Sequence, residues 1–471
     1  MGKLPVRPVL WVVVLIVVSG MIVGYRYVIA GYEAQAASST IDEHVVREEP
    51  PKPAKPLQAR VTMPDRKGIP PENVGSGWPA ILGSAGDCTS LERGLDWSWS
   101  EEGPPLRWRV DCGTGYSAPV VLDDQLVLFH RVEENEVIDC FAAETGRPRW
   151  SFSAPATFKC KVNYSSGPYS TPYLEADRLY AIGALGQLYC IDLSDGSLRW
   201  QRNLHDDYKV VIDYWPATAS PIVESGLVIV NVGGRKGAGI VAFDRESGET
   251  IWTATDDGPS CSTPVAATIH DRRFLFVWTA DALVALDPID GSVYWRFSFS
   301  ANNQEAAHGT SPLVIDDVVI VSGYQIGNLC IRVLPDGSAK ELWRDQRKLL
   351  DSQYHNLLNI GGNVCGFAST RHGMRCLDLQ TGESLWQWRA RAGGSMIAVD
   401  GRYLLIDIKG RLSALAINDC GAELLVKTDE PLLATPCFSY PALHNGLFYL
   451  RNEEELLCYD LRRPEELTDT P

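Results

Sequence analysis

Short runs of apolar residues alternate with turn residues along most of this chain. One stretch shows the pattern clearly, and its apolar runs are Thr171–Leu174, Leu179–Ile182, Gln187–Leu193 and Leu198–Arg202. Gly183, Gly186 and the pair Asp195-Gly196 separate the later runs. Such spacing is typical of β-strands joined by tight turns, because Gly tolerates the positive φ that hairpin turns need. The stretch therefore predicts four short antiparallel strands.

The four-strand pattern recurs with a marker at its end. In five copies a small residue is followed six residues later by Gly and four residues after that by Trp: Cys140–Trp150, Cys190–Trp200, Ala242–Trp252, Ala285–Trp295 and Cys376–Trp386. Two degenerate copies end at Trp343 and near Leu424. Neighbouring tryptophans are about 40–50 residues apart, which is the period of four-stranded β-propeller blades.

A second marker counts the units. A small polar residue and Pro open six of them: Ser117-Ala118-Pro119, Ser170-Thr171-Pro172, Ser220-Pro221, Ser262-Thr263-Pro264, Ser311-Pro312 and Thr435-Pro436. Two more units begin near His355 and Ser395. The last unit has no fourth strand of its own, so Leu106–Asp111 is expected to complete it and close the ring. The prediction is an all-β, eight-bladed β-propeller, with seven blades as the alternative.

The regular recurrence of tryptophan favours a packing role between blades over ligand stacking. This expectation covers Trp108, Trp150, Trp200, Trp252, Trp295, Trp343 and Trp386.

The N-terminus has a different composition. Lys3 and Arg7 precede an apolar run that begins at Val9, and residues 9–30 are expected to form a transmembrane signal-anchor helix with residues 1–8 in the cytoplasm. Cleavage after Ala34-Gln35-Ala36 is the alternative. Residues 31–77 predict a disordered, Pro-rich tether, followed by a lead-in segment (78–105), the propeller (106–463) and a tail (464–471). A single-pass inner-membrane protein with a periplasmic propeller is expected.

Charge and cysteine content narrow the class of partner. The net charge of −16 disfavours nucleic acid. Of the 12 cysteines, four occupy the small position of the repeat and are expected to serve there as compact apolar thiols: Cys140, Cys190, Cys376 and Cys458. Five others lie nearer strand ends or loops, and this allows one or two disulfide bonds without assigning their pairing: Cys112, Cys160, Cys261, Cys420 and Cys437. No motif indicates a metal site.

The repeat resembles that of the PQQ-like propeller family, which contains quinoprotein alcohol dehydrogenases and non-catalytic BamB-like outer-membrane assembly subunits. The resemblance implies that the repeat glycines dock against the tryptophans: Gly146, Gly196, Gly248, Gly291 and Gly382. The segment Gly77–Ser90 also looks like the WPxxxGxxxDGxS opening of exported, planctomycete-type members, except that Cys88 stands in place of Gly.

The two branches of the family differ in chemistry. A dehydrogenase would need pyrroloquinoline quinone, Ca²⁺ and a carboxylate base. This chain has compact units and no adjacent Cys pair, both of which favour a non-catalytic, membrane-tethered propeller that binds an envelope protein as a monomer. This interpretation requires no cofactor, whereas the alternative, a quinone-dependent dehydrogenase, would bind pyrroloquinoline quinone and Ca²⁺. A small-ligand-binding propeller is the third hypothesis.

Candidate ligand residues lie in the loops that leave each outer strand, because these loops converge on one mouth of the channel. The candidates are Asn163, Tyr164, Asp213, Tyr214, Trp215, Asn302, Asn303, His308, His355 and Asn356. None of them forms a recognised catalytic motif.

Overall fold

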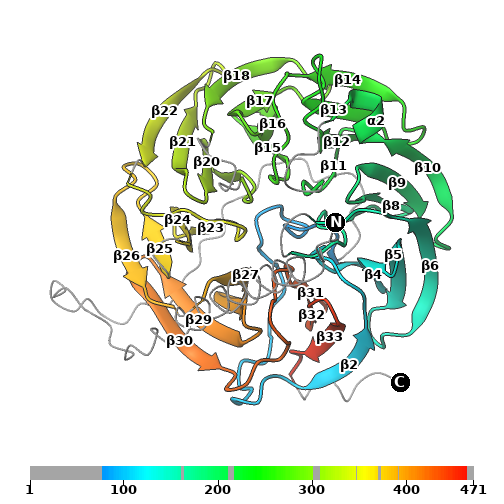
Figure 1. Ribbon diagram of the computed structural model, residues 1–471. Helices are drawn as coiled ribbons and strands as arrows, with labels where there is room; N and C mark the ends of the chain where they lie inside the picture. Colours follow the sequence, from blue (N-terminus) through cyan, green and yellow to red (C-terminus); the bar gives the residue numbers. More distant parts are fainter. Residues whose placement is uncertain are drawn as a thin grey trace, which may run out of the picture. The chain divides into compact units, whose positions relative to one another are not determined.

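The structure of the chain, a computed structural model, describes residues 77–160, 164–210, 217–300, 308–345, 347–369, 373–390 and 392–463. These residues form eight antiparallel sheets arranged as the blades of a ring (Figure 1). The prediction of an all-β, eight-bladed propeller is confirmed, and the seven-bladed alternative is wrong. Among the described residues no helix has the length and apolar character needed to cross a membrane. The anchor predicted at 9–30 lies outside them.

The first four blades follow the chain from inner to outer strand. Blade 1 contains β3 (Val120–Leu122), β4 (Gln125–Val132), β5 (Asn135–Ala142) and β6 (Pro148–Pro155), with β1 (Gly77–Trp78) added to β3. Blade 2 contains β7 (Tyr173–Leu174), β8 (Arg178–Ile182), β9 (Gln187–Asp192) and β10 (Leu198–Asn203). Blade 3 contains β11 (Ile222–Glu224), β12 (Leu227–Asn231), β13 (Ile240–Asp244) and β14 (Thr250–Ala254). Blade 4 contains β15 (Val265–Ile269), β16 (Arg272–Trp278), β17 (Ala282–Leu286) and β18 (Val293–Ser298).

The remaining blades complete the ring. Blade 5 contains β19 (Leu313–Ile315), β20 (Val318–Gly323), β21 (Gly327–Val333) and β22 (Ala339–Asp345). Blade 6 contains β23 (Leu358–Ile360), β24 (Asn363–Phe367), β25 (Met374–Leu377) and β26 (Ser384–Trp388). Blade 7 contains β27 (Gly394–Val399), β28 (Arg402–Asp407), β29 (Leu412–Asn418) and β30 (Gly421–Lys427). Blade 8 contains β31 (Ala442–His444), β32 (Leu447–Arg451), β33 (Glu455–Asp460) and, from the start of the propeller, β2 (Leu106–Asp111).

The closing strand is the one that the sequence predicts. β2 pairs antiparallel with β33, and Trp108 lies opposite Cys458. The eighth opening, however, was misplaced at Thr435-Pro436. The residues that lead into β31 are Ser439-Tyr440-Pro441, which repeat the Ser-x-Pro pattern of the first two blades.

Antiparallel order fixes two faces of the ring. Every connection from an outer strand to the next inner strand lies on one face, here called the loop face, and every turn after an inner strand lies on the other, here called the turn face. One loop-face connection contains a short helix, α2 (Leu204–Tyr208), whose N-terminus is capped by the Asn203 side chain accepting from Asp206 N.

The lead-in segment starts near the middle of the ring and then runs to the rim, as the blue trace in Figure 1 shows. On the turn face, Gly77 pairs with Leu122, and Glu92 accepts a hydrogen bond from Gly446 N. Between Gly77 and Glu92 along the chain, Cys88 lies in the same buried cluster as Leu82, Phe367 and Met396. Cys88 also adopts φ 61°, which explains why the related opening motif carries Gly at this position.

Candidate functional site

The repeat tryptophans contact the following blade. The indole Nε1 of Trp200 donates to Arg245 O at 3.1 Å, and its ring lies against Gly248. The same arrangement joins Trp108 to Gly146, Trp150 to Gly196, Trp252 to Gly291 and Trp343 to Gly382. These residues therefore connect neighbouring blades.

Two junctions differ because the following repeat is degenerate. The Nε1 atoms of Trp295 and Trp386 are buried and lack a hydrogen-bond partner among the described residues. Arg272 occupies the space where a Cβ on Gly337, which follows Trp295 in the ring, would lie, and a Cβ added to Gly421, which follows Trp386, would meet no atom within 4 Å.

The polar residues that open the blades form a hydrogen-bonded belt around the channel. Thr171 Oγ1 accepts from Ala118 N at 3.0 Å, Ser220 Oγ from Thr171 N at 2.9 Å, and Thr263 Oγ1 from Ser220 N at 3.2 Å. Asn356 Oδ1 continues the belt by accepting from Ser311 N at 2.7 Å. Asn356, a predicted ligand residue, is therefore engaged in joining blades 5 and 6.

Four aromatic side chains gather on the loop face, and we call them the mouth cluster: Tyr116, Tyr164, Tyr354 and Phe438. Phe438 is central, with its ring centroid 5.2 Å from Tyr116, 6.1 Å from Tyr164 and 5.1 Å from Tyr354. The four residues come from four different loop-face connections, so the cluster links blades that are not neighbours. Tyr164 is 39% exposed and the other three are partly buried.

Buried polar contacts hold the loops of the mouth cluster. Arg131 donates to Ser166 O at 3.1 Å, and the Tyr116 hydroxyl accepts from Ser165 N at 3.1 Å. Arg451 is 1% exposed and donates to Gly113 O at 2.7 Å. Burial raises the pKa of Tyr116 and lowers that of Arg451, so the phenol is neutral at physiological pH while the guanidinium keeps its charge.

The two predicted histidines are buried against aromatic rings. His308 packs edge-on against Trp278 at 4.6 Å, and His355 against Tyr354 at 4.5 Å. Burial lowers the pKa of His308 to about 4 and that of His355 to about 3, so both rings are neutral near pH 7. His355 adjoins the mouth cluster through Tyr354, whereas His308 lies with blade 4.

Four of the ten candidates lie among the described residues. Tyr164 belongs to the mouth cluster, His355 contacts it and Asn356 lies in the belt, whereas His308 lies with blade 4. The other six candidates lie outside the described residues: Asn163, Asp213, Tyr214, Trp215, Asn302 and Asn303.

Sequence reasoning missed three members of the mouth cluster. Tyr116 and Phe438 each precede the Ser of a Ser-x-Pro opening, as Tyr169 does in blade 2. An aromatic-Ser-x-Pro motif could therefore have identified two of them. Tyr354 has no such marker, because blade 6 lacks the Ser-x-Pro opening.

The described residues in the middle of the ring do not fit a quinone with Ca²⁺. Leu82 and Cys88 of the lead-in fill it, and the Cys88 thiol bonds to Asn356 while Tyr440 lies close by. In the described part of the chain there is also no cluster of three acidic, His or Cys side chains able to hold a metal ion, whereas Ca²⁺ takes six to eight oxygen ligands.

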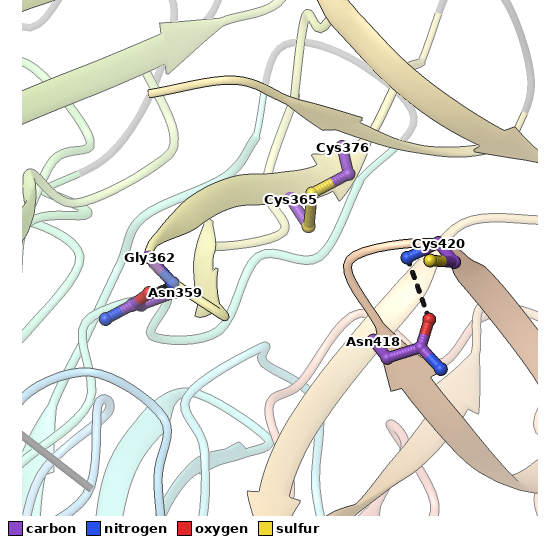
Figure 2. The surroundings of a disulfide bond; sticks show 6 residues. All are labelled: Asn359, Gly362, Cys365, Cys376, Asn418 and Cys420. Atoms are coloured by element: carbon purple, nitrogen blue, oxygen red, sulfur yellow. Dashed lines mark hydrogen bonds between the residues drawn. A yellow bond between two sulfur atoms is a disulfide. The ribbon is translucent and has the colours of Figure 1, made fainter. Parts of the chain in front are cut away.

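One cysteine in the small position of the repeat is not a thiol. Cys376 forms a disulfide with Cys365, directly opposite it in the β24–β25 pair with the Cα atoms 4.1 Å apart (Figure 2). The prediction of a thiol at Cys376 is wrong because its cross-strand neighbour is a cysteine. The equivalent neighbours of Cys140, Cys190 and Cys458 are Val127, Tyr180 and Tyr449, and these three cysteines are thiols.

Four-stranded blades joined by Trp–Gly contacts define the PQQ-like class of β-propeller. A family model described as outer membrane protein assembly factor BamB matches residues 134–388, more than half of the chain, and the chain belongs to this family.

Individual relatives are distant. BamB of Yersinia pestis is 23% identical over 318 residues, covering 65% of this chain and 78% of the relative. BamB of Bordetella pertussis is 22% identical over 294 residues, covering 59% of this chain and 67% of the relative.

Solved structures show the same fold. The crystal structure of BamB from Moraxella catarrhalis matches with a TM-score of 0.54 at 16% identity, over 76% of this chain and 98% of that one. The crystal structure of quinohemoprotein alcohol dehydrogenase from Comamonas testosteroni matches with a TM-score of 0.55 at 13% identity, over 82% of this chain and 80% of that one. At these identities the likeness supports the fold, and it does not separate assembly factors from dehydrogenases.

Proposed function

We propose that this chain is a non-catalytic β-propeller, tethered to the inner membrane and facing the periplasm, that binds another envelope protein. The observation that carries the proposal is membership of the BamB family, whose named relatives are outer membrane protein assembly factors. A second observation agrees with a non-catalytic role, because the lead-in segment fills the position where a quinone-dependent enzyme would need a pocket.

The mouth cluster supplies one surface suited to protein contact. Partly exposed Tyr and Phe side chains are enriched at protein interfaces, because they bury a large area at low conformational cost. Tyr164 is the most exposed of the four.

The binding role is tested by replacing Tyr164 with a photo-crosslinking amino acid in the full-length protein, expressed in its own host. We expect irradiation of intact cells to give a discrete adduct with an envelope protein. The matched control carries the same amino acid at Ile289, which is 66% exposed but lies in a turn away from the loop face. Adducts of the same proteins from both positions would indicate random collision and contradict the proposal.

The tether is tested separately. The full-length protein should stay with membranes after alkaline extraction and be digested by protease added to spheroplasts. Removal of residues 9–30 should release it. Extraction of the intact chain, or protection from the protease, would contradict the proposed location.

A further inference from the structure

The outer strand of each blade has one edge without a neighbouring strand. Such an edge presents a row of N–H and C=O groups that can pair with another extended chain, and charged side chains normally prevent this. Of the eight outer strands that the structure describes, six contain Arg, Lys, Glu or Asp: β2, β6, β10, β18, β22 and β30. Only β14 and β26 contain no charged residue.

The two uncharged edges differ in their surroundings. Thr250, the first residue of β14, is hydrogen bonded through Oγ1 to the Tyr208 hydroxyl of α2 at 2.6 Å, so the start of this edge has a neighbour. In the described part of the chain β26 pairs with β25 alone. Its Leu385 side chain is 45% exposed.

An apolar surface adjoins the β26 edge. The neighbouring outer strand, β30, lies beside β26 at the rim of the ring (Figure 1) and exposes Leu424 and Leu425, each 42%. Val426 has replaced the repeat tryptophan there, since it lies opposite Ala414 in the small position. The rim between blades 6 and 7 therefore combines an unpaired backbone with exposed leucines.

Blade 6 is also held rigid near this edge. The disulfide joins β24 to β25, and β25 is the strand that pairs with β26. A rigid edge loses less conformational entropy when a strand is added to it.

We propose that β26 is a docking edge at which an extended segment of the partner protein adds as a fifth strand of blade 6. The inference rests on the proposed binding function and specifies that the partner binds by adding a strand to the sheet. The unpaired backbone requires an extended segment without proline, because proline cannot donate to the ladder. Side chains on one face of this segment reach Leu424 and Leu425 and are apolar, and those on the other face approach the charged strand β22 and are polar. The segment thus alternates apolar and polar residues.

The test uses the full-length protein in detergent and a fluorescent peptide of about ten residues that alternates valine and threonine, which spans the edge as an extended strand. We expect saturable binding by fluorescence anisotropy, and slower hydrogen exchange of the amides of Ser384–Trp388 in the bound state. A peptide N-methylated at alternate residues cannot donate to the ladder and should not bind.

Two substitutions localise the binding. Leu385→Lys places a charge on the edge and should weaken binding about tenfold or more. Ile251→Lys is the matched control, because Ile251 precedes the repeat tryptophan of β14 as Leu385 does in β26 and is 52% exposed. It should leave the affinity within about twofold of the parent.

No saturable binding, equal loss in both variants, or slower exchange only outside β26 would overturn the docking edge. Crosslinking from Tyr164 would still succeed in that case if the protein binds a partner elsewhere. Peptide binding at β26 without any specific adduct from Tyr164 in cells would instead leave the edge in place and remove the mouth cluster as the surface that contacts the partner.

Discussion

In five repeats, the glycine before the outer strand makes room for a tryptophan ring from the preceding blade. A Cβ added to Gly248 would lie 2.7 Å from the Trp200 ring, and Gly248 has φ +69°. Gly237 has a similar φ of +81° but no neighbour within 4 Å. The two positions share the backbone requirement and differ only in the docking contact.

Gly248→Ala should therefore destabilise the protein more than Gly237→Ala. The backbone strain common to both costs about 1 kcal/mol, and overpacking against Trp200 adds about 1–3 kcal/mol at Gly248 alone. Urea unfolding of the two purified variants measures the difference. Equal free energies of unfolding would show that the Trp–Gly contact contributes no specificity to blade docking.

Buried neutral histidines make stability depend on pH. The unfolded chain binds protons at His308 and His355 below about pH 6.5, whereas the folded pKa values are about 4 and about 3. Between these limits the unfolded state holds more protons than the native state. Below pH 6.5 the free energy of unfolding therefore decreases as the pH decreases, and above pH 6.5 the two rings do not affect it.

Each histidine should contribute a slope that approaches about 1.4 kcal/mol per pH unit between about pH 6 and 5. His355→Asn should reduce the slope of unfolding free energy against pH by about this amount, whatever it does to absolute stability. His270→Asn is the control, because the His270 side chain is exposed. An unchanged slope in His355→Asn would mean that His355 is protonated in the native state.

At the level of the strand, the disulfide constrains the blade that precedes a degenerate repeat. Blade 6 has short strands, and its Trp386 indole faces a degenerate repeat that offers Nε1 no acceptor among the described residues. Figure 2 places Cys365 and Cys376 near the β29–β30 turn, where Asn418 Oδ1 accepts from Cys420 N at 2.8 Å. The covalent bond joins two strands of this blade, whose Trp386 Nε1 has no hydrogen-bond acceptor among the described residues.

Removing the disulfide should cost about 2–3 kcal/mol, because it closes a loop between residues separated by 11 positions. The double substitution Cys365→Ala and Cys376→Ala tests this by urea unfolding under non-reducing conditions. Cys140→Ala is the matched control, since Cys140 occupies the same repeat position as a thiol and Ala242 fills it in blade 3. A similar small effect in both variants would contradict a stapling role.

For the molecule as a whole, the filled channel decides which branch of the fold's chemistry is accessible. The lead-in brings Trp78, Leu82 and Cys88 into the core, each less than 7% exposed. A ligand that entered the middle of the ring beside Leu82 and Cys88 would have to displace these side chains from their buried apolar contacts.

Titration of the purified protein with pyrroloquinoline quinone and Ca²⁺ should change neither its absorbance nor its melting temperature beyond the sum of the components. Ligand that binds the native state stabilises it by mass action, so a rising melting temperature is a sensitive sign of binding. A saturable change in both signals would contradict the non-catalytic proposal, and oxidation of alcohols would then be measured.

The propeller could be predicted closely because its repeat is local. In blade 2 the predicted strand Leu179–Ile182 differs by one residue from β8 (Arg178–Ile182), since Gly and Asp mark the turns directly. The binding surface was predicted less well, because Tyr116, Tyr354 and Phe438 are far apart along the chain. Only the closed ring brings them together.

The sequence by itself determined the number of blades, the strand that closes the ring and the apolar character of each blade, because these follow from a short pattern repeated along the chain. Tertiary structure alone decided the partner of Cys376, the mouth cluster, the filling of the channel by residues after Gly77 and the neutral state of His355. Each of these depends on register between strands or on burial between distant segments, and periodicity carries no information about either.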